Sequence, residues 1–167
     1  MNNKVYKKIF DSLGIKLASW NPNPDKDKNF LDHCDCAIRG IMKYTNNDSW
    51  EDVYFDLCTL GSKYGLLPDT VDIVNRYLKL YNIKYKIKHK FEIHAWETPL
   101  NIIYNNIDSE MLLVGATHTF YYKNRTIYDK RNPEDDKFNR ITYRTYMESL
   151  DYISKTESKI WLYIKEE

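Results

Sequence analysis

The first half of the chain carries hydrophobic residues at helical spacing. After a short amphipathic start, one pattern begins at Cys36, where four apolar residues fall on one helix face. These are Ala37, Ile38, Ile41 and Met42. A second helix is predicted to begin near residues 48–51 and to stop at Gly61, with Asp48 and Glu51, or Ser49 and Asp52, as its capping pair. A third is predicted over residues 69–80.

The second half favours strands. Apolar and polar residues alternate, or short apolar runs occur, in five segments, which are residues 85–88, 111–114, 117–122, 126–128 and 160–164. Thr98 and Pro99 look like the cap and first position of a short helix through Ile103. Because helices come first and strands later, the pattern predicts an α+β fold with a mostly antiparallel sheet, in a single domain spanning residues 1–167.

Composition and charge narrow the class of protein. Hydrophobic residues make up 43% and aromatic residues 15% of the 167 residues, which is typical of a folded globular chain. The 25 basic and 24 acidic residues nearly balance, and this disfavours a nucleic-acid partner. No segment is apolar enough for a membrane span or a signal peptide, and three cysteines cannot all pair with one another. We therefore expect a cytoplasmic protein without a membrane partner.

The three cysteines are candidates for a zinc site, a disulfide or core packing. Cys34 and Cys36 are one residue apart, and with His33 they offer some of the ligands of a zinc site, although no second ligand pair follows at the usual spacing. A disulfide between Cys34 and Cys36 would close a strained small ring. Cys58 lies on an apolar helix face and is predicted to pack in the core.

Cys36 also fits a nucleophile. A helix N-terminus presents unpaired N–H groups and a positive dipole end, which lower the pKa of a thiol there. The alternative is a small buried residue that simply opens the helix.

A thiol nucleophile needs a base and a group that orients the base. Among the four histidines, His118 stands out because a hairpin follows it. If Asn124 and Arg125 form a two-residue turn, Lys123 faces Thr126, and His118 and Asp129 point to the same side as diagonal neighbours. The alternative is a strand histidine with an ordinary structural role.

Taken together, these motifs resemble papain-like cysteine peptidases, and more narrowly small papain-fold proteins of bacteria and their phages. The resemblance rests on the stretch DCAIRG, on SWEDVY in the next helix, and on a histidine followed eleven residues later by an aspartate, and it spans residues 29–132. It implies a helical half packed on a sheet half. It also implies Cys36 as nucleophile, His118 as base and Asp129 as orienting group, with Asn132 as an alternative to Asp129. Asn29 is the candidate for an oxyanion-binding amide.

The implied activity is hydrolysis of an amide or isopeptide-type bond in a peptide or protein, through an acyl-enzyme and without a cofactor. Two alternatives remain open. The same three residues would also serve an acyltransferase or transglutaminase, and the fold without the reaction would serve an inactive binding or inhibitor protein. Four aromatic residues are candidates for lining the substrate groove, with core packing as the alternative for each. They are Trp50, Trp96, Tyr121 and Tyr122.

Overall fold

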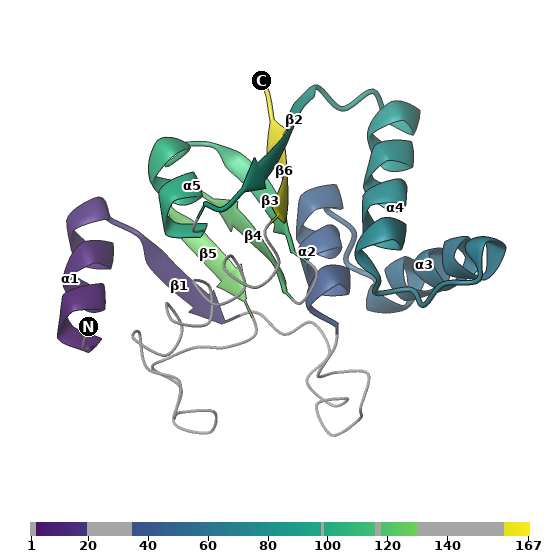
Figure 1. Cartoon of the computed structure of the whole chain (residues 1–167), viewed down its shortest axis with the longest axis horizontal. Coiled ribbons are helices and arrows are strands. Elements are labelled where there is room, and N and C mark those ends of the chain that lie inside the picture. The colour runs from purple at the N-terminus through teal and green to yellow at the C-terminus, as the bar shows by residue number, and fades with distance from the viewer. Residues whose placement is uncertain (1–2, 20–34, 98, 116–117, 130–158) are drawn as a thin grey trace.

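The fold is mixed α+β. It is seen in a computed structural model that describes residues 3–19, 35–97, 99–115, 118–129 and 159–167 (Figure 1). The helices are α1 (Asn3–Leu13), α2 (Cys36–Thr45), α3 (Trp50–Tyr64), α4 (Val71–Lys84) and α5 (Pro99–Asn105). The strands are β1 (Lys16–Ser19), β2 (His89–Ala95), β3 (Glu110–Val114), β4 (Thr119–Lys123), β5 (Thr126–Asp129) and β6 (Lys159–Lys165). The predicted α+β class is confirmed. No helix within the described ranges is long and apolar enough to cross a bilayer.

The strands form one sheet in the order β1-β5-β4-β3-β6-β2. The neighbours β5–β4, β4–β3, β3–β6 and β6–β2 are antiparallel, and β1 pairs with β5 in parallel. The predicted mostly antiparallel sheet is therefore confirmed for the described strands. The parallel strand β1 was not predicted, because its four residues are too few to show a clear alternation.

Helices cover both faces of the sheet (Figure 1). On one face, the buried residues of α2, α3 and α4 form a cluster with Leu112, Tyr121 and Tyr163 of the sheet. On the other face, residues of α1 and α5 pack with Met111, Phe120 and their neighbours. Alternation along each strand explains this division, since successive side chains point to opposite faces.

Helix α3 runs past the point where the sequence predicted its end. Ser49 caps its N-terminus by accepting a hydrogen bond from the Asp52 N–H (3.2 Å), which is one of the two predicted caps. The predicted stop at Gly61 is wrong. The helix ends at Tyr64 and is capped by Gly65, whose φ of 69° is the left-handed conformation that glycine adopts readily. Gly61 instead makes room for the returning chain, because a Cβ there would lie 2.4 Å from the Leu66 carbonyl oxygen.

The predicted strand over residues 85–88 is also wrong. Helix α4 continues through Lys84, Tyr85 caps it, and Lys86 turns the chain with a φ of 52° before β2 begins at His89. Tyr77, Tyr81 and Tyr85 recur every four residues, and their rings form neighbouring contacts along one side of the helix end. The four-residue spacing of these tyrosines is the helical signal, and it was hidden by the local alternation of lysines with apolar residues.

Candidate functional site

Cys36 is the first residue of α2 and is partly exposed. The helix forms here because the four apolar positions predicted for it, from Ala37 to Met42, are all buried against the sheet or α3. Its N-cap residue is Asp35, and its C-cap residue is Asn46, which has a left-handed φ of 54°. The predicted position of Cys36 at a helix N-terminus is therefore confirmed.

His118 lies immediately before β4. A hydrogen bond from the Gly115 N–H to the His118 carbonyl oxygen (2.9 Å) links the end of β3 to this residue. The His118 ring is partly buried, and its centroid lies 6.2 Å from that of Phe120. His118 therefore stands at the end of the sheet where β3 stops and β4 starts.

The hairpin that follows has the predicted register. Lys123 faces Thr126 and Tyr121 faces Tyr128. Asn124 and Arg125 have φ values of 52° and 55°, which is the type I′ pattern that matches strand twist. Asp129 is the last residue of β5, so its backbone lies at the same end of the sheet as the start of β4.

Several predicted residues cannot be compared with the structure. The side chain of Asp129 lies outside the described part of the chain, as do Asn29 and Asn132. His33 and Cys34, the further ligands of the alternative zinc site, lie outside it too, so that alternative stays a prediction.

Helix α2 runs along the sheet in the same direction as β4. Near its C-terminal end, the Tyr44 carbonyl oxygen accepts a hydrogen bond from Lys165, which pairs with Glu110 at the start of β3. In its middle, Gly40 lies against Leu112 and Thr119, the first residue of β4. The N-terminus of α2 is therefore directed to the end of the sheet at which β4 begins.

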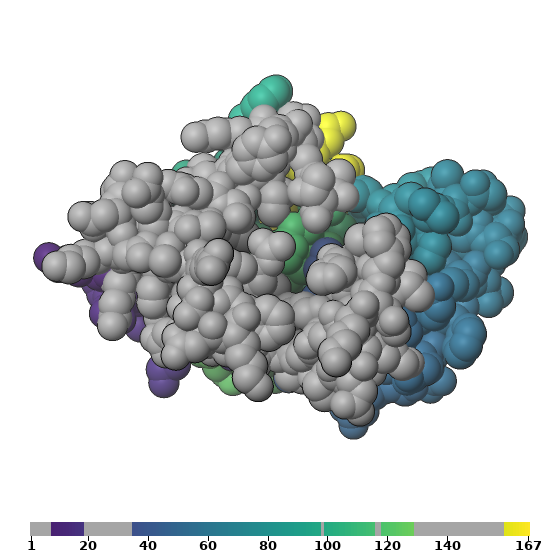
Figure 2. Space-filling view, turned by 90° about the horizontal axis from the view of Figure 1, so that it is seen from below, coloured from purple at the N-terminus to yellow at the C-terminus, as the bar shows by residue number. Residues whose placement is uncertain are grey.

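This direction brings two predicted site residues to one end of the molecule. Cys36 precedes Gly40 by one helical turn, a rise of about 6 Å, and His118 precedes Thr119 by one residue. In Figure 1, α2 begins at the lower side of the molecule, where β5 ends. Seen from below, dark blue atoms of α2 and green atoms of the sheet are visible together near the centre (Figure 2).

The two residues approach this end from different faces of the sheet. Thr119 faces α2, whereas the His118 ring neighbours Phe120, which belongs to the core on the opposite face. Contact between them therefore requires the thiol to reach beyond the first residue of β4. Gly40 lies against Thr119, and Cys36 lies one helical turn before Gly40. The helical rise therefore places Cys36 beyond Thr119, past the start of β4.

A buried ion pair beside Cys36 was missed by the sequence reasoning. Arg39 Nη2 lies 2.8 Å from Asp35 Oδ1, and both side chains are less than a tenth exposed. Trp50 Nε1 donates a hydrogen bond to Asp35 Oδ2 (3.0 Å). The four-residue spacing of Asp35 and Arg39 across Cys36 is the signal that could have indicated this pair.

The aromatic residues proposed for a groove have different surroundings. Trp50, Tyr121 and Tyr122 are buried, which agrees with core packing, whereas Trp96 is 77% exposed. Cys58 is half-buried rather than fully enclosed in the core.

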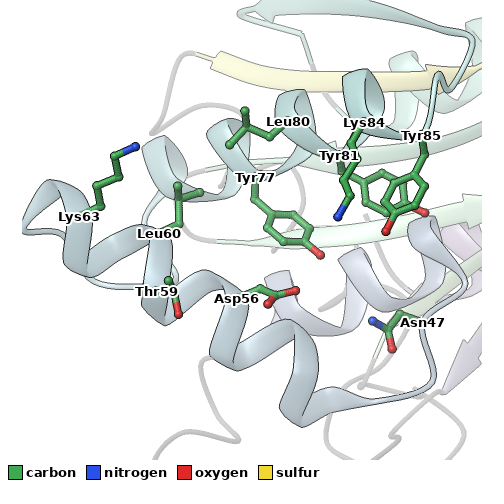
Figure 3. Close-up of a pocket in the computed structure, with 10 residues that line it drawn as sticks. All are labelled: Asn47, Asp56, Thr59, Leu60, Lys63, Tyr77, Leu80, Tyr81, Lys84 and Tyr85. Atoms are coloured by element: carbon green, nitrogen blue, oxygen red, sulfur yellow. The ribbon is translucent and has the colours of Figure 1, made fainter.

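A separate groove of about 370 Å³ lies between α3 and α4 (Figure 3). Tyr77, Tyr81 and Tyr85 line it from α4, and Asp56 lines it from α3. Burial, followed by the nearby Asp56 carboxylate, raises the pKa of Tyr77 to about 12. None of the predicted site residues lines this groove, so it is distinct from the region around Cys36.

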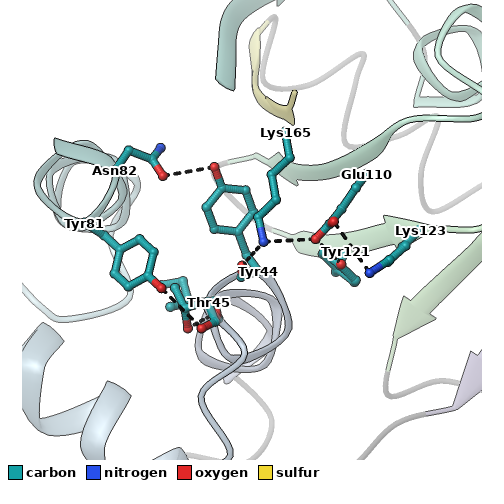
Figure 4. Close-up of polar contacts among 9 residues, drawn as sticks. Tyr44, Thr45, Tyr81, Asn82, Glu110, Tyr121, Lys123 and Lys165 are labelled. Atoms are coloured by element: carbon teal, nitrogen blue, oxygen red, sulfur yellow. Dashed lines mark hydrogen bonds and ion pairs between the residues drawn. The ribbon is translucent and has the colours of Figure 1, made fainter. Parts of the chain in front are cut away.

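A polar network occupies the opposite end of the sheet (Figure 4). Glu110 accepts a hydrogen bond from the Tyr121 hydroxyl, and Lys165 Nζ lies 3.0 Å from its carboxylate. Burial opposes ionisation of Glu110, but the Tyr121 hydrogen bond and the Lys165 cation outweigh it, so its pKa is lower than usual. The network joins the last strand to α2 through the Tyr44 carbonyl oxygen.

Lys165→Met is expected to lower the free energy of unfolding by about 2 kcal/mol at pH 7, because it removes the nearest cation from a largely buried carboxylate. The pKa of Glu110 is lower in the folded protein, so the stabilisation is present above the ordinary value of 4.5 and is lost as the pH falls through the folded value. Urea denaturation at pH 7 and below pH 4 measures both effects.

Lys123→Met is the matched control. Lys123 Nζ lies 3.7 Å from Glu110, and its side chain is 48% exposed, so its removal should cost less than about 0.5 kcal/mol. Equal losses for the two lysine variants, or a Lys165→Met loss that persists in acid, would contradict this account.

No protein-family model matches the chain, and neither a curated protein nor a solved structure shows significant similarity to it.

Proposed function

We propose that this protein is a papain-like cysteine hydrolase that cleaves an amide or isopeptide-type bond in a peptide or protein. Cys36 is the nucleophile, His118 the general base, and Asp129 the group that orients the imidazole. The observation that carries the proposal is the direction of α2: its N-terminus lies at the end of the sheet where His118 precedes β4 and where β5 ends at Asp129.

The chemistry follows from these positions. The His118 imidazole takes the thiol proton, and the resulting thiolate is stabilised by the imidazolium and by the N-terminus of α2. The thiolate attacks the carbonyl carbon and forms a tetrahedral oxyanion, which expels the amine after His118 protonates it. Water then attacks the acyl-enzyme and releases the acid.

The oxyanion needs hydrogen-bond donors. The backbone N–H of Cys36 supplies one in this proposal, and the Asn29 amide supplies the second. Loss of one such donor costs about 3 kcal/mol of transition-state stabilisation in comparable sites.

The test requires no substrate. Iodoacetamide alkylates thiolates, so Cys36 is expected to react about tenfold faster than Cys34 and Cys58 at pH 7, with each site quantified by fragmentation of its peptide in mass spectrometry. Equal and slow labelling of all three cysteines would reject the hydrolase and leave a binding protein on the same fold. If Cys36 is reactive, release of acid or transfer to an added amine separates a hydrolase from an acyltransferase or transglutaminase.

A further inference from the structure

The N-cap residue of α2 is acidic and directly precedes the proposed nucleophile. Asp35 is 2% exposed, and its carboxylate meets the Arg39 guanidinium and the Trp50 indole N–H. We propose that Arg39 is a positioning residue that neutralises the buried Asp35 carboxylate and thereby keeps the Cys36 thiol ionised. This inference rests on the proposed role of Cys36 as a thiolate nucleophile.

The conformation of Asp35 supports this role. As the N-cap residue it has φ −94° and ψ 16°, and its side chain makes no capping hydrogen bond to the first turn of α2. The carboxylate is held by Arg39 and Trp50 instead of the backbone N–H groups that follow it. The positive end of the helix is therefore not quenched by the side chain that would ordinarily cap it.

The charge of Asp35 would otherwise act against the thiolate. A carboxylate one residue before a thiol disfavours ionisation of that thiol, because like charges repel. Water screens this repulsion only in part, since Asp35, Ala37 and Ile38 are buried whereas Cys36 is partly exposed. Arg39 lies one turn further along the same helix, and its cation offsets the repulsion.

Other charged groups that face α2 lie mostly at its far end. Lys43 sits over the Tyr128 ring of β5, and the Glu110–Lys165 pair of β3 and β6 lies beside Tyr44. His118, which precedes β4, is at the same end as Asp35. Helix α3, whose Trp50 contacts Asp35, carries Glu51 and Asp52 in its first turn. The Asp35–Arg39 pair adjoins the first turn of α2.

The pair is poorly suited to a purely stabilising role. Burying two charges has a large desolvation cost, and Arg39 Nη1 is buried without a hydrogen-bond partner among the described residues. Removal of one partner leaves a buried unpaired charge, whereas removal of both leaves none. This difference allows the electrostatic role to be separated from a structural one.

The experiment measures the pKa of the Cys36 thiol from the pH dependence of its iodoacetamide alkylation in the full-length protein. Arg39→Met is expected to raise the thiol pKa by about 1. At a pH below both values this should slow alkylation by about threefold, because the smaller thiolate fraction is partly offset by the higher nucleophilicity of the thiolate. Asp35→Asn keeps an acceptor for Trp50 and is expected to lower the pKa. In the double variant Asp35→Asn/Arg39→Met, the thiol pKa should return close to the wild-type value. Arg39→Lys keeps the positive charge and should also have a thiol pKa close to the wild-type value.

Two results would overturn the inference. One is an unchanged thiol pKa in Arg39→Met. The other is a double variant with a pKa as high as that of Arg39→Met, since a structural role is not rescued by removing the second charge. If Arg39→Met does not fold, Asp35→Asn tests the inference by itself. A Cys36 thiol pKa that is unchanged or higher in Asp35→Asn rejects the inference.

These outcomes are distinct from failure of the proposed function. The thiol pKa is measured without turnover, so a response to Asp35 and Arg39 is detectable even in a protein that hydrolyses nothing. The hydrolase proposal fails instead when Cys36 reacts no faster than Cys58.

Discussion

Alkylation of Cys36 at pH 6 is expected to slow about 30-fold when His118 is replaced by alanine. An ordinary thiol has a pKa of about 8.5 and is mostly protonated at pH 6, whereas a thiol paired with an imidazolium at a helix N-terminus remains ionised. The wild-type protein holds more of Cys36 as thiolate, but a low-pKa thiolate is a weaker nucleophile. The expected change of about 30-fold in rate takes both effects into account. The rate is measured with iodoacetamide between pH 5 and 9, and the acidic limb of the profile should disappear in the variant.

His89→Ala is the matched control. His89 lies in β2 opposite Lys165, at the end of the sheet away from the N-terminus of α2. Its replacement should change the rate by less than about twofold, because no charge near the thiol is altered. If His118→Ala and His89→Ala slow Cys36 equally, or if neither does, His118 is not the base.

Gly40→Val is expected to lower the free energy of unfolding by about 3 kcal/mol. A Cβ on Gly40 would lie 2.9 Å from Leu112 Cδ1 and 3.0 Å from Thr119 Cγ2. The two further methyl groups of valine have no space there, so α2 has to move away from β3 and β4. Urea denaturation followed by circular dichroism measures the loss.

Gly40→Val also tests whether the reactivity of Cys36 depends on how α2 packs on the sheet. Because Cys36 lies one turn before Gly40 on the same helix, moving α2 off the sheet should also slow alkylation of Cys36 in the fraction that remains folded. Gly40→Ala is the control. Its single methyl group meets only the ends of two side chains. The higher helix propensity of alanine offsets about 1 kcal/mol of the steric cost, so the free energy of unfolding should change by less than about 1 kcal/mol. A fully stable Gly40→Val protein would contradict the close approach of α2 to the sheet.

Local signals account for the predictions that the structure confirms. The apolar positions from Ala37 to Met42 follow the helical period and are buried. The two-residue turn at Asn124 and Arg125 sets the register of β4 and β5 by itself. In both cases the residues that determine the structure are neighbours in the chain, so no knowledge of the rest of the fold is needed.

The wrong predictions arose where a local pattern had two interpretations. Residues 85–88 alternate as a strand does, yet contacts of Tyr81 and Tyr85 accompany the continuation of α4. Gly61 resembles a helix stop, yet the returning chain at Leu66 requires its small size inside α3. Only the way these residues pack in the folded chain separates these possibilities.

The sequence by itself determined the types of most elements, the chemistry available at Cys36 and His118, and the hairpin register, because each depends on neighbours within a few residues. Only the tertiary structure decided that β1 joins β5 in parallel, that Trp50 reaches Asp35, and that α2 runs along β4 with its N-terminus toward His118. These features join residues far apart in the chain. They are determined by how the two faces of the sheet are filled, and no short-range spacing encodes that.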